Sequence, residues 1–307
     1  MSDRKPFSFI ITVGALAAAG AVLYYSIRQL PQDVGGAPSA SMTGVSLHAL
    51  AEAGNITGLE AQIKAGAKID TGLEDGPLAQ RGMTPLMTAI FAGQEKAAEI
   101  LLAAKPQLEA RSRDGRTALI WAAGWGTPEM VQKLLDAGAE KDARDEANFT
   151  SLIMAAARGE AKSVDILIKS GADINAKNKW NHTALMTAIR TGNKEKIEAL
   201  LNAGAGVNDA DLDGLTPVHM AAESDAPVGT LEMIQKRGGN LDAQSAAGLT
   251  ALMIAADRGE ADKVKALLAL GAKAALKDKD GATALDWANR RADDAGKAVA
   301  ELLQKAK

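Results

Sequence analysis

Side chains that commonly perform chemistry are scarce in this chain of 307 residues. There is no cysteine, which excludes disulfides, thiolate metal sites and cysteine nucleophiles. The imidazoles are those of His48, His182 and His219. We find no phosphate-binding loop, no HExxH pair and no nucleophile elbow in the sequence. We therefore expect a protein that is not an enzyme, with no cofactor, no metal site and no small-molecule substrate.

Two recurring patterns are similar to known binding or modification motifs. Stretches such as residues 278–281 (DKDG) look like calcium loops, but they lack the later Glu of an EF-hand. Residues 148–150 (NFT) and 181–183 (NHT) match the glycosylation acceptor pattern. In both tripeptides Asn stands where Gly115 and Gly281 stand elsewhere, so a left-handed turn before a helix-capping Thr accounts for them. We interpret all of these as turns.

Composition and charge narrow the class of protein. Hydrophobic residues make up 47% of the chain and aromatic residues 3%, so the core must be built from Ala, Leu, Ile and Met, which favours closely packed helices. The net charge of −3 argues against a basic nucleic-acid surface, because phosphate binding needs clustered Lys and Arg. We expect no nucleic-acid partner.

The amino terminus carries an export signal. Residues 7–27 form an uncharged run of 21 residues, and a helix of that length spans roughly 31 Å, about the thickness of a bilayer core. Arg4 and Lys5 precede the run and Arg28 follows it, so residues 1–6 are predicted to be a cytoplasmic tail and the rest to lie outside. Residues 19–21 (AGA) also suit a signal peptidase, which leaves a cleaved signal as the alternative.

Both interpretations place the remainder of the chain outside the cytoplasm. Residues 28–44 are rich in Gly, Pro, Ser and Ala and are predicted to be a flexible linker. We expect a single-pass inner-membrane protein of bacterial type whose later residues face the periplasm, or a soluble periplasmic or secreted protein if the signal is removed.

A repeat fills residues 45–307. A Thr followed by Pro, Ala or Ser and then an aliphatic residue recurs at intervals of 33 residues five times and 34 once, starting at Thr84, Thr117, Thr150, Thr183, Thr216, Thr250 and Thr283. Each Thr suits the N-cap of a helix. An Ala stands five residues after every one of them, and such small residues let neighbouring helices approach closely. Glycines such as Gly171 then suit the end of a second helix.

The period and the phrases resemble the ankyrin-repeat family, whose signature is Thr-Pro-Leu-His-x-Ala; residues 216–221 (TPVHMA) are nearest to it and 84–89 (TPLMTA) are close. The resemblance implies an all-α repeat solenoid of helix-turn-helix units with β-hairpin-like fingers. We count about eight units, including a degenerate first unit from Leu47 and a polar cap at the carboxy terminus. It also implies that His48 and His219 bond to neighbouring backbone.

The resemblance further implies that a partner protein binds through the finger tips and the inner, concave face of the first helices. Carried over by register, the candidate partner-binding residues are Met83, Phe91, Arg113, Arg116, Trp125, Phe149, Arg158, Trp180, His182, Arg190 and Leu215. Exposed Trp, Phe and Arg side chains are typical of binding hot spots. The alternative interpretation of Phe149 is that it packs against His182 in the next finger.

Other residues have competing interpretations. We expect Trp121 and Trp287 to be core residues, because Met and Ile occupy their position in other units. The basic row Arg111, Arg144, Lys177 and Lys277 either steers an acidic partner or is a solvated edge. Lys105 replaces the glycine that usually ends the second helix.

The resulting expectation is a protein-protein interaction module in the periplasm that carries out no chemistry. The alternative function is an immunity-type or stress-protective inhibitor of a toxin or enzyme.

Overall fold

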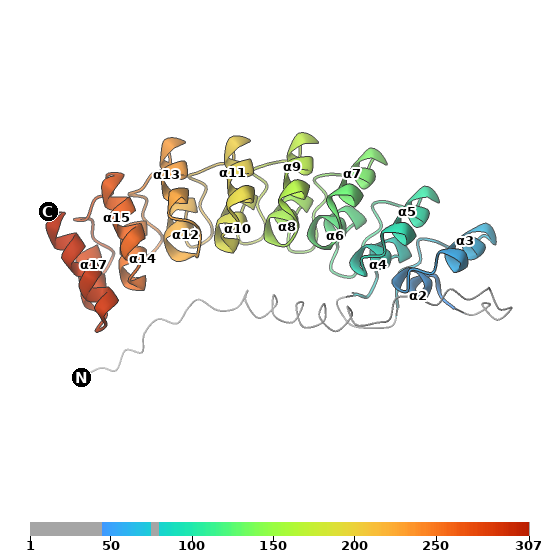
Figure 1. The fold of residues 1–307 in the computed structure, drawn as a ribbon, viewed down its shortest axis with the longest axis horizontal. Coiled ribbons are helices and arrows are strands. Elements are labelled where there is room, and N and C mark those ends of the chain that lie inside the picture. The colour runs from blue at the N-terminus through green and yellow to red at the C-terminus, as the bar shows by residue number, and fades with distance from the viewer. Residues whose placement is uncertain (1–44, 75–79, 307) are drawn as a thin grey trace. The chain divides into compact units, whose positions relative to one another are not determined.

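The fold is a row of helix pairs. The computed structural model describes residues 45–74 and 80–306, and Ser46–Lys307 form one compact unit. The described residues contain sixteen α-helices and no strand (Figure 1). The first helices of the pairs are α2 (Leu47–Glu52), α4 (Pro85–Phe91), α6 (Ala118–Trp125), α8 (Ser151–Ala157), α10 (Ala184–Thr191), α12 (Pro217–Glu223), α14 (Ala251–Arg258) and α16 (Ala284–Asn289).

The second helices complete eight pairs. They are α3 (Ile56–Lys64), α5 (Glu95–Ala103), α7 (Pro128–Asp136), α9 (Ala161–Lys169), α11 (Lys194–Asn202), α13 (Gly229–Lys236), α15 (Ala261–Ala269) and α17 (Asp294–Lys305). Each first helix packs on its own second helix and on the first helices of adjacent pairs, and the second helices form a parallel row. The expected all-α repeat solenoid of eight units is confirmed.

Threonine and alanine set the geometry of the first helices, as the repeat predicts. Thr150, for example, caps α8 by accepting the backbone N–H of Ile153. The alanines five residues after each Thr are buried against adjacent first helices, among them Ala122, Ala155 and Ala188. A larger side chain at these positions would push neighbouring pairs apart.

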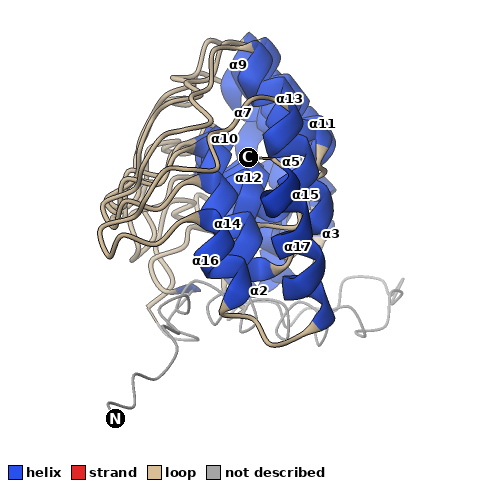
Figure 2. Ribbon diagram, turned by 90° about the vertical axis from the view of Figure 1, so that its left-hand side faces the viewer, coloured by secondary structure: helices blue, strands red, loops and turns tan. Residues whose placement is uncertain are grey.

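The fingers between pairs are turns, with no strand in the described part of the chain. They gather on one side of the helices (Figure 2). Single backbone hydrogen bonds join neighbouring tips, as from Lys179 N–H to the carbonyl of Ala147 (3.0 Å). Asn148 and Asn181 at the tips both have a φ of 60°, so the predicted left-handed turns are confirmed at these two positions.

The basic row forms a ladder along the base of the fingers. Arg111 Nη1 donates to the carbonyl of Arg144 (2.6 Å), and Arg144 Nη1 donates to the carbonyl of Lys177 (2.9 Å). Lys177 Nζ in turn pairs with Asp209 Oδ1 (2.7 Å). These side chains connect one repeat to the next, a role that neither interpretation of the sequence included.

Two histidines also tie repeats together. His48 Nε2 lies 2.8 Å from the carbonyl oxygen of Met83. His219 Nδ1 accepts the N–H of Thr216 (3.1 Å), so Nε2 carries the proton and donates to the carbonyl of Leu249 (2.9 Å). Burial lowers the pKa of His219 and keeps the ring neutral, although its backbone hydrogen bonds act in the opposite direction. The predicted structural role of His48 and His219 is confirmed.

Residues 1–44 lie outside the described part of the chain, and with them the predicted tail (1–6), membrane or signal segment (7–27) and linker (28–44). Within residues 45–74 and 80–306, none of the helices has the length and apolarity needed to cross a bilayer.

Candidate functional site

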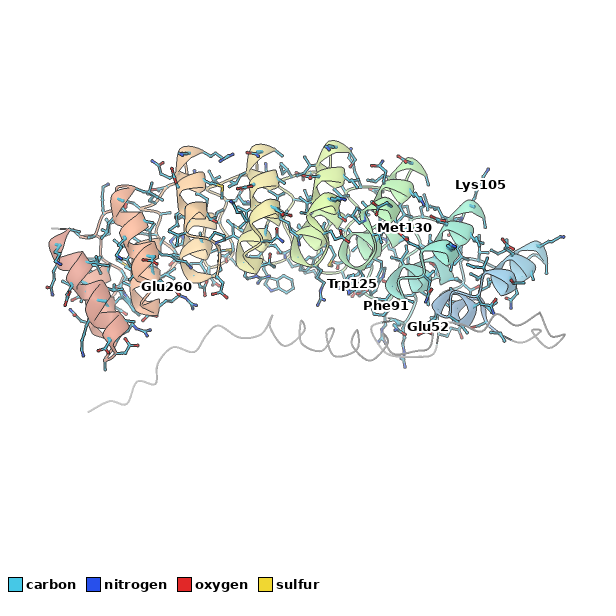
Figure 3. All side chains as sticks on the ribbon, in the orientation of Figure 1. Glu52, Phe91, Lys105, Trp125, Met130 and Glu260 are labelled. Atoms are coloured by element: carbon cyan, nitrogen blue, oxygen red, sulfur yellow. The ribbon has the colours of Figure 1, made fainter. Side chains whose placement is uncertain are left out.

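An aromatic and arginine cluster forms where α4, α6 and α8 meet the fingers. We call Phe91, Arg116, Trp121, Trp125 and Arg158 the Trp125 cluster. The ring centroids of Trp121 and Trp125 lie 4.8 Å apart, and that of Phe91 lies 5.4 Å from Trp121 and 6.4 Å from Trp125. Phe91 and Trp125 lie near each other on the first-helix side of the row (Figure 3). Phe91 and Trp125, both predicted partner-binding residues, thus have neighbouring rings.

Trp121 is the buried base of the cluster. Only 2% of its surface is exposed, and its Nε1 donates to Ser112 Oγ (3.4 Å). Trp125 follows one turn later on the same helix and remains half-buried. Gly124 allows α6 to approach α8, because a Cβ there would lie 2.7 Å from the Cγ of Met154. The prediction that Trp121 belongs to the core is confirmed.

Arg116 is held in place by acids and rings. Its guanidinium pairs with Asp114 (3.0 Å) and with Asp145 (3.4 Å). Its Cζ lies over the rings of both tryptophans, 5.0 Å from the centroid of Trp121 and 5.2 Å from that of Trp125. Cation–π contacts of this kind add to the hydrophobic attraction and fix the ring orientation. Arg116 therefore serves chiefly to position the two tryptophans.

Arg158 also contacts the ring of Trp125. Its Cζ lies 5.0 Å from the Trp125 centroid, and the residue is exposed at the end of α8. The pKa of Arg158 lies below the usual arginine value, because partial burial and then the charge of Arg116 disfavour its cationic form. It still carries a full charge at neutral pH.

A second apolar group lies at the finger tips. We call Phe149, Trp180 and Leu212 the tip cluster. The ring centroids of Phe149 and Trp180 are 6.1 Å apart, and Leu212 N–H donates to the carbonyl of Trp180 (3.3 Å). Trp180 is 47% exposed and Leu212 is 64% exposed. Leu212 is absent from the predicted site, although it has the same finger-tip register as Arg113, so the repeat alone could have identified it.

Asx turns hold the backbone of the tip cluster. Asn178 Oδ1 accepts the N–H groups of Trp180 (2.9 Å) and His182 (3.0 Å). In the next finger, Asp211 Oδ1 accepts from Leu215 (2.8 Å), while its Oδ2 lies 3.4 Å from His182 Nε2. Burial raises the pKa of Asp211, but the hydrogen bonds from His182 and from the backbone lower it by more. The net pKa of Asp211 is therefore below the usual value.

Not every predicted site residue lies on this surface. Met83 is only 1% exposed, so the expectation that it lies on an exposed edge is wrong. The chain around it is pulled inward, because Leu73 and Met83 share a backbone hydrogen bond (2.8 Å) and His48 reaches the Met83 carbonyl. Arg113 is exposed at a finger tip, as predicted.

His182 and Leu215 are half-buried at the bases of two fingers, where the Asp211 contacts fix them. Arg190 is exposed at the end of α10. Its pKa is lowered by partial burial, with Glu223 opposing the shift. Neither His182 nor Arg190 makes a ring contact with the Trp125 cluster.

Trp287 departs from expectation as well. It is half-buried rather than a core residue, with Nε1 donating to Asp278 Oδ2 (2.9 Å) and Arg290 Cζ lying 4.1 Å from the ring centroid. Its helix, α16, belongs to the last described pair, so no further first helix of the described residues packs on the ring. The regular spacing of the repeat does not predict this exposure of Trp287.

Comparison with known families identifies the repeat. A family model for ankyrin repeats (3 copies) matches residues 47–145, 152–236 and 228–307. The chain belongs to the ankyrin-repeat family. No curated protein matches it. Ankyrin repeats are generally protein-protein interaction modules, which confirms the predicted class of function. Within the described residues of this ankyrin domain, no group of three or more His, Asp or Glu side chains is arranged to hold a metal ion.

Proposed function

We propose that this chain is an exported ankyrin protein that binds a partner protein through its finger and first-helix surface, around Trp125. The observation that carries the proposal is the Trp125 cluster, in which two arginines lie over a half-buried tryptophan, 5.2 and 5.0 Å from its ring centroid. Trp and Arg are the residues most enriched in binding hot spots. Because these side chains are already ordered by their mutual contacts, binding costs little further conformational entropy.

Binding without catalysis is part of the proposal. Two of the three histidines, His48 and His219, use their rings to join backbone segments of neighbouring repeats. His182 is paired with Asp211 at the base of a finger. The ring nitrogens of these imidazoles therefore take part in structural contacts, which compete with proton transfer to a substrate.

The proposed location is the periplasmic side of an inner membrane. It is supported by the uncharged run at residues 7–27 and by the positive charges of Arg4 and Lys5 before it. A phosphatase that is active only outside the cytoplasm, fused after Lys307, should show activity in cells. An inactive fusion that accumulates to normal levels would overturn the location but not the binding surface.

Crosslinking in intact cells tests the binding surface. A photoreactive amino acid at Arg113, on an exposed finger, should capture a partner identified by mass spectrometry. The same probe at Gln132, exposed on the second helix of the same repeat, is the matched control. The amino-terminal peptide recovered in the same experiment distinguishes an anchored from a cleaved chain.

Variants then test the cluster itself. Trp125→Ala combined with Arg158→Ala should abolish capture at Arg113 while the chain stays folded by circular dichroism, because Arg158 is exposed and Trp125 is only half-buried. Full capture by this double variant would refute the assignment of the surface.

A further inference from the structure

The charges around Trp125 are unevenly compensated. Arg116 has two carboxylates, those of Asp114 and Asp145, at 3.0 and 3.4 Å. Arg158, whose Cζ lies 5.0 Å from the centroid of the Trp125 ring, has neither an ion pair nor a side-chain hydrogen bond to any described residue. The charge that acts on it most strongly is the like charge of Arg116. The N–H groups of Arg158 therefore face solvent without an acceptor from the described protein.

We propose that Arg158 binds a carboxylate of the partner, and that an apolar side chain next to this carboxylate packs on Trp125 and Phe91. The occupant is thus an acidic segment of protein with an aromatic or aliphatic neighbour. This inference rests on the proposed function and specifies the chemistry of its partner.

A carboxylate fits the donors that Arg158 offers. A guanidinium presents its N–H groups as a planar fork that matches the two oxygens of a carboxylate. Trp125 shields one side of the group, which strengthens a charge-assisted bond by reducing competition from water. The half-buried ring of Phe91, 6.4 Å from Trp125, extends the apolar floor beside it.

The neighbouring acids disfavour a polyanion. Asp114 and Asp145 pair with Arg116 within the same cluster, so a phosphate or a nucleic-acid backbone would meet two negative charges near Arg158, the arginine of this cluster that lacks an ion pair with a described residue. One carboxylate balances Arg158 and meets less of this repulsion than a polyanion does. The partner chemistry that the site favours is therefore a singly charged acid within an apolar context.

Arg258 provides a matched control within the same chain. Arg158 and Arg258 both stand eight residues after the capping Thr of their units, Thr150 and Thr250, and both are exposed. At the same register in the unit before Arg258 stands Ser224, whereas Trp125 stands in the unit before Arg158. The two arginines thus share their charge and their spacing from the capping Thr, and they differ in the aromatic residue at the same register of the preceding unit.

A peptide selection tests the inference. The full chain, kept in a non-ionic detergent, is used to select from a displayed library of random twelve-residue peptides, with Trp125→Ala as the counter-selection. Peptides that survive should be enriched in Asp or Glu next to aromatic or aliphatic residues. Each is then synthesised in its acidic form and with Asn or Gln in place of the acid, and also with a free or an amidated carboxy terminus.

The affinities of these peptides show whether Arg158 binds a carboxylate. Replacing the acid with its amide, or making Arg158→Gln, should weaken binding by about tenfold or more, because a charge-assisted hydrogen bond is lost. Arg258→Gln should leave the affinity unchanged within about twofold. If amidation of the terminus has the larger effect, the carboxylate is that of a chain end and the inference still holds.

Three results would overturn it: selected peptides without acids, equal affinity of the acidic and amide forms, or equal effects of Arg158→Gln and Arg258→Gln. Failure to select any Trp125-dependent peptide would also count against it. None of these results bears on crosslinking at Arg113, so the proposed surface and the proposed partner chemistry fail separately.

Discussion

The Trp125 cluster and the tip cluster both present a tryptophan, but they hold it in different ways. Trp125 is fixed by side chains from three repeats, which contribute Phe91, Arg116 and Arg158. Trp180 is fixed mainly through its backbone, by the side chain of Asn178 and by Leu212, and its ring is 47% exposed. A side-chain framework gives a rigid anchor, whereas a backbone framework leaves the ring free to adapt to a partner.

The largest contrast is expected in stability. Trp121→Ala removes a buried ring from the base of the Trp125 cluster and should lower the free energy of unfolding by about 3–5 kcal/mol. Trp180→Ala removes an exposed ring and should change it by less than about 0.5 kcal/mol. Urea unfolding followed by circular dichroism measures both. Similar losses for the two variants would mean that the tip cluster is also part of the core.

Affinity for the partner should show the next largest contrast. With the partner captured by crosslinking, Trp125→Ala should weaken binding by about a hundredfold, as expected for a central hot spot of about 2–3 kcal/mol. Trp180→Ala should cost about tenfold or less, because an exposed and adaptable ring gains less on binding. Titration by calorimetry distinguishes the two. The reverse order would place the centre of the interface at the finger tips.

Acid should weaken the fingers of the tip cluster through Asp211. The folded-state pKa of Asp211 lies below its unfolded value of about 3.9, so its stabilising contribution is fully present above that pH and is lost as the pH falls through the folded pKa. Asp211→Asn should be less stable than the parent by about 1 kcal/mol at pH 7.

The difference between Asp211→Asn and the parent should begin to shrink below about pH 3.9 and vanish only as the pH falls through the lower folded-state pKa of Asp211. Thermal unfolding across pH 3–7 measures it. A difference that is independent of pH would show that the loss does not come from the charge of the Asp211 carboxylate.

The smallest effect is expected at the left-handed turn before His182. Asn181 has a φ of 60°, a conformation that glycine adopts more readily, so Asn181→Gly should stabilise the chain by about 0.5 kcal/mol or less. Asn181→Ala should destabilise it by about 1 kcal/mol, since alanine gains nothing there. Chemical denaturation resolves the pair. Equal stabilities would indicate that this finger unfolds before the helices do.

The same comparison explains what the sequence could predict. The capping Thr and the buried Ala of each unit act within one repeat and its neighbour, so a regular period is enough to locate them. Met83 and Trp287 break the pattern, because the first is drawn inward by Leu73 and His48 and the second lacks a following helix. Such effects depend on the Leu73–Met83 hydrogen bond and on the last described helix pair, neither of which the regular spacing of the repeat predicts.

The contacts made by long side chains could not be predicted from the sequence for another reason. The register placed Trp125 and Arg158 at equivalent positions of adjacent units. It did not predict that the arginine lies over the ring. It likewise gave no sign that Arg111 spans one whole repeat to reach the carbonyl of Arg144. Both depend on where a flexible side chain ends, which the spacing of residues along the chain does not specify.

The ladder that begins at Arg111 connects the base of each finger to the base of the next by a hydrogen bond. Each rung from Arg111 and Arg144 runs to a carbonyl 33 residues further along, so tilting one finger stretches or releases the bond to the next. A partner that spreads two fingers must break one rung, while the bonds beyond it stay intact. The fingers should therefore separate one repeat at a time, and their original spacing should return when the partner dissociates.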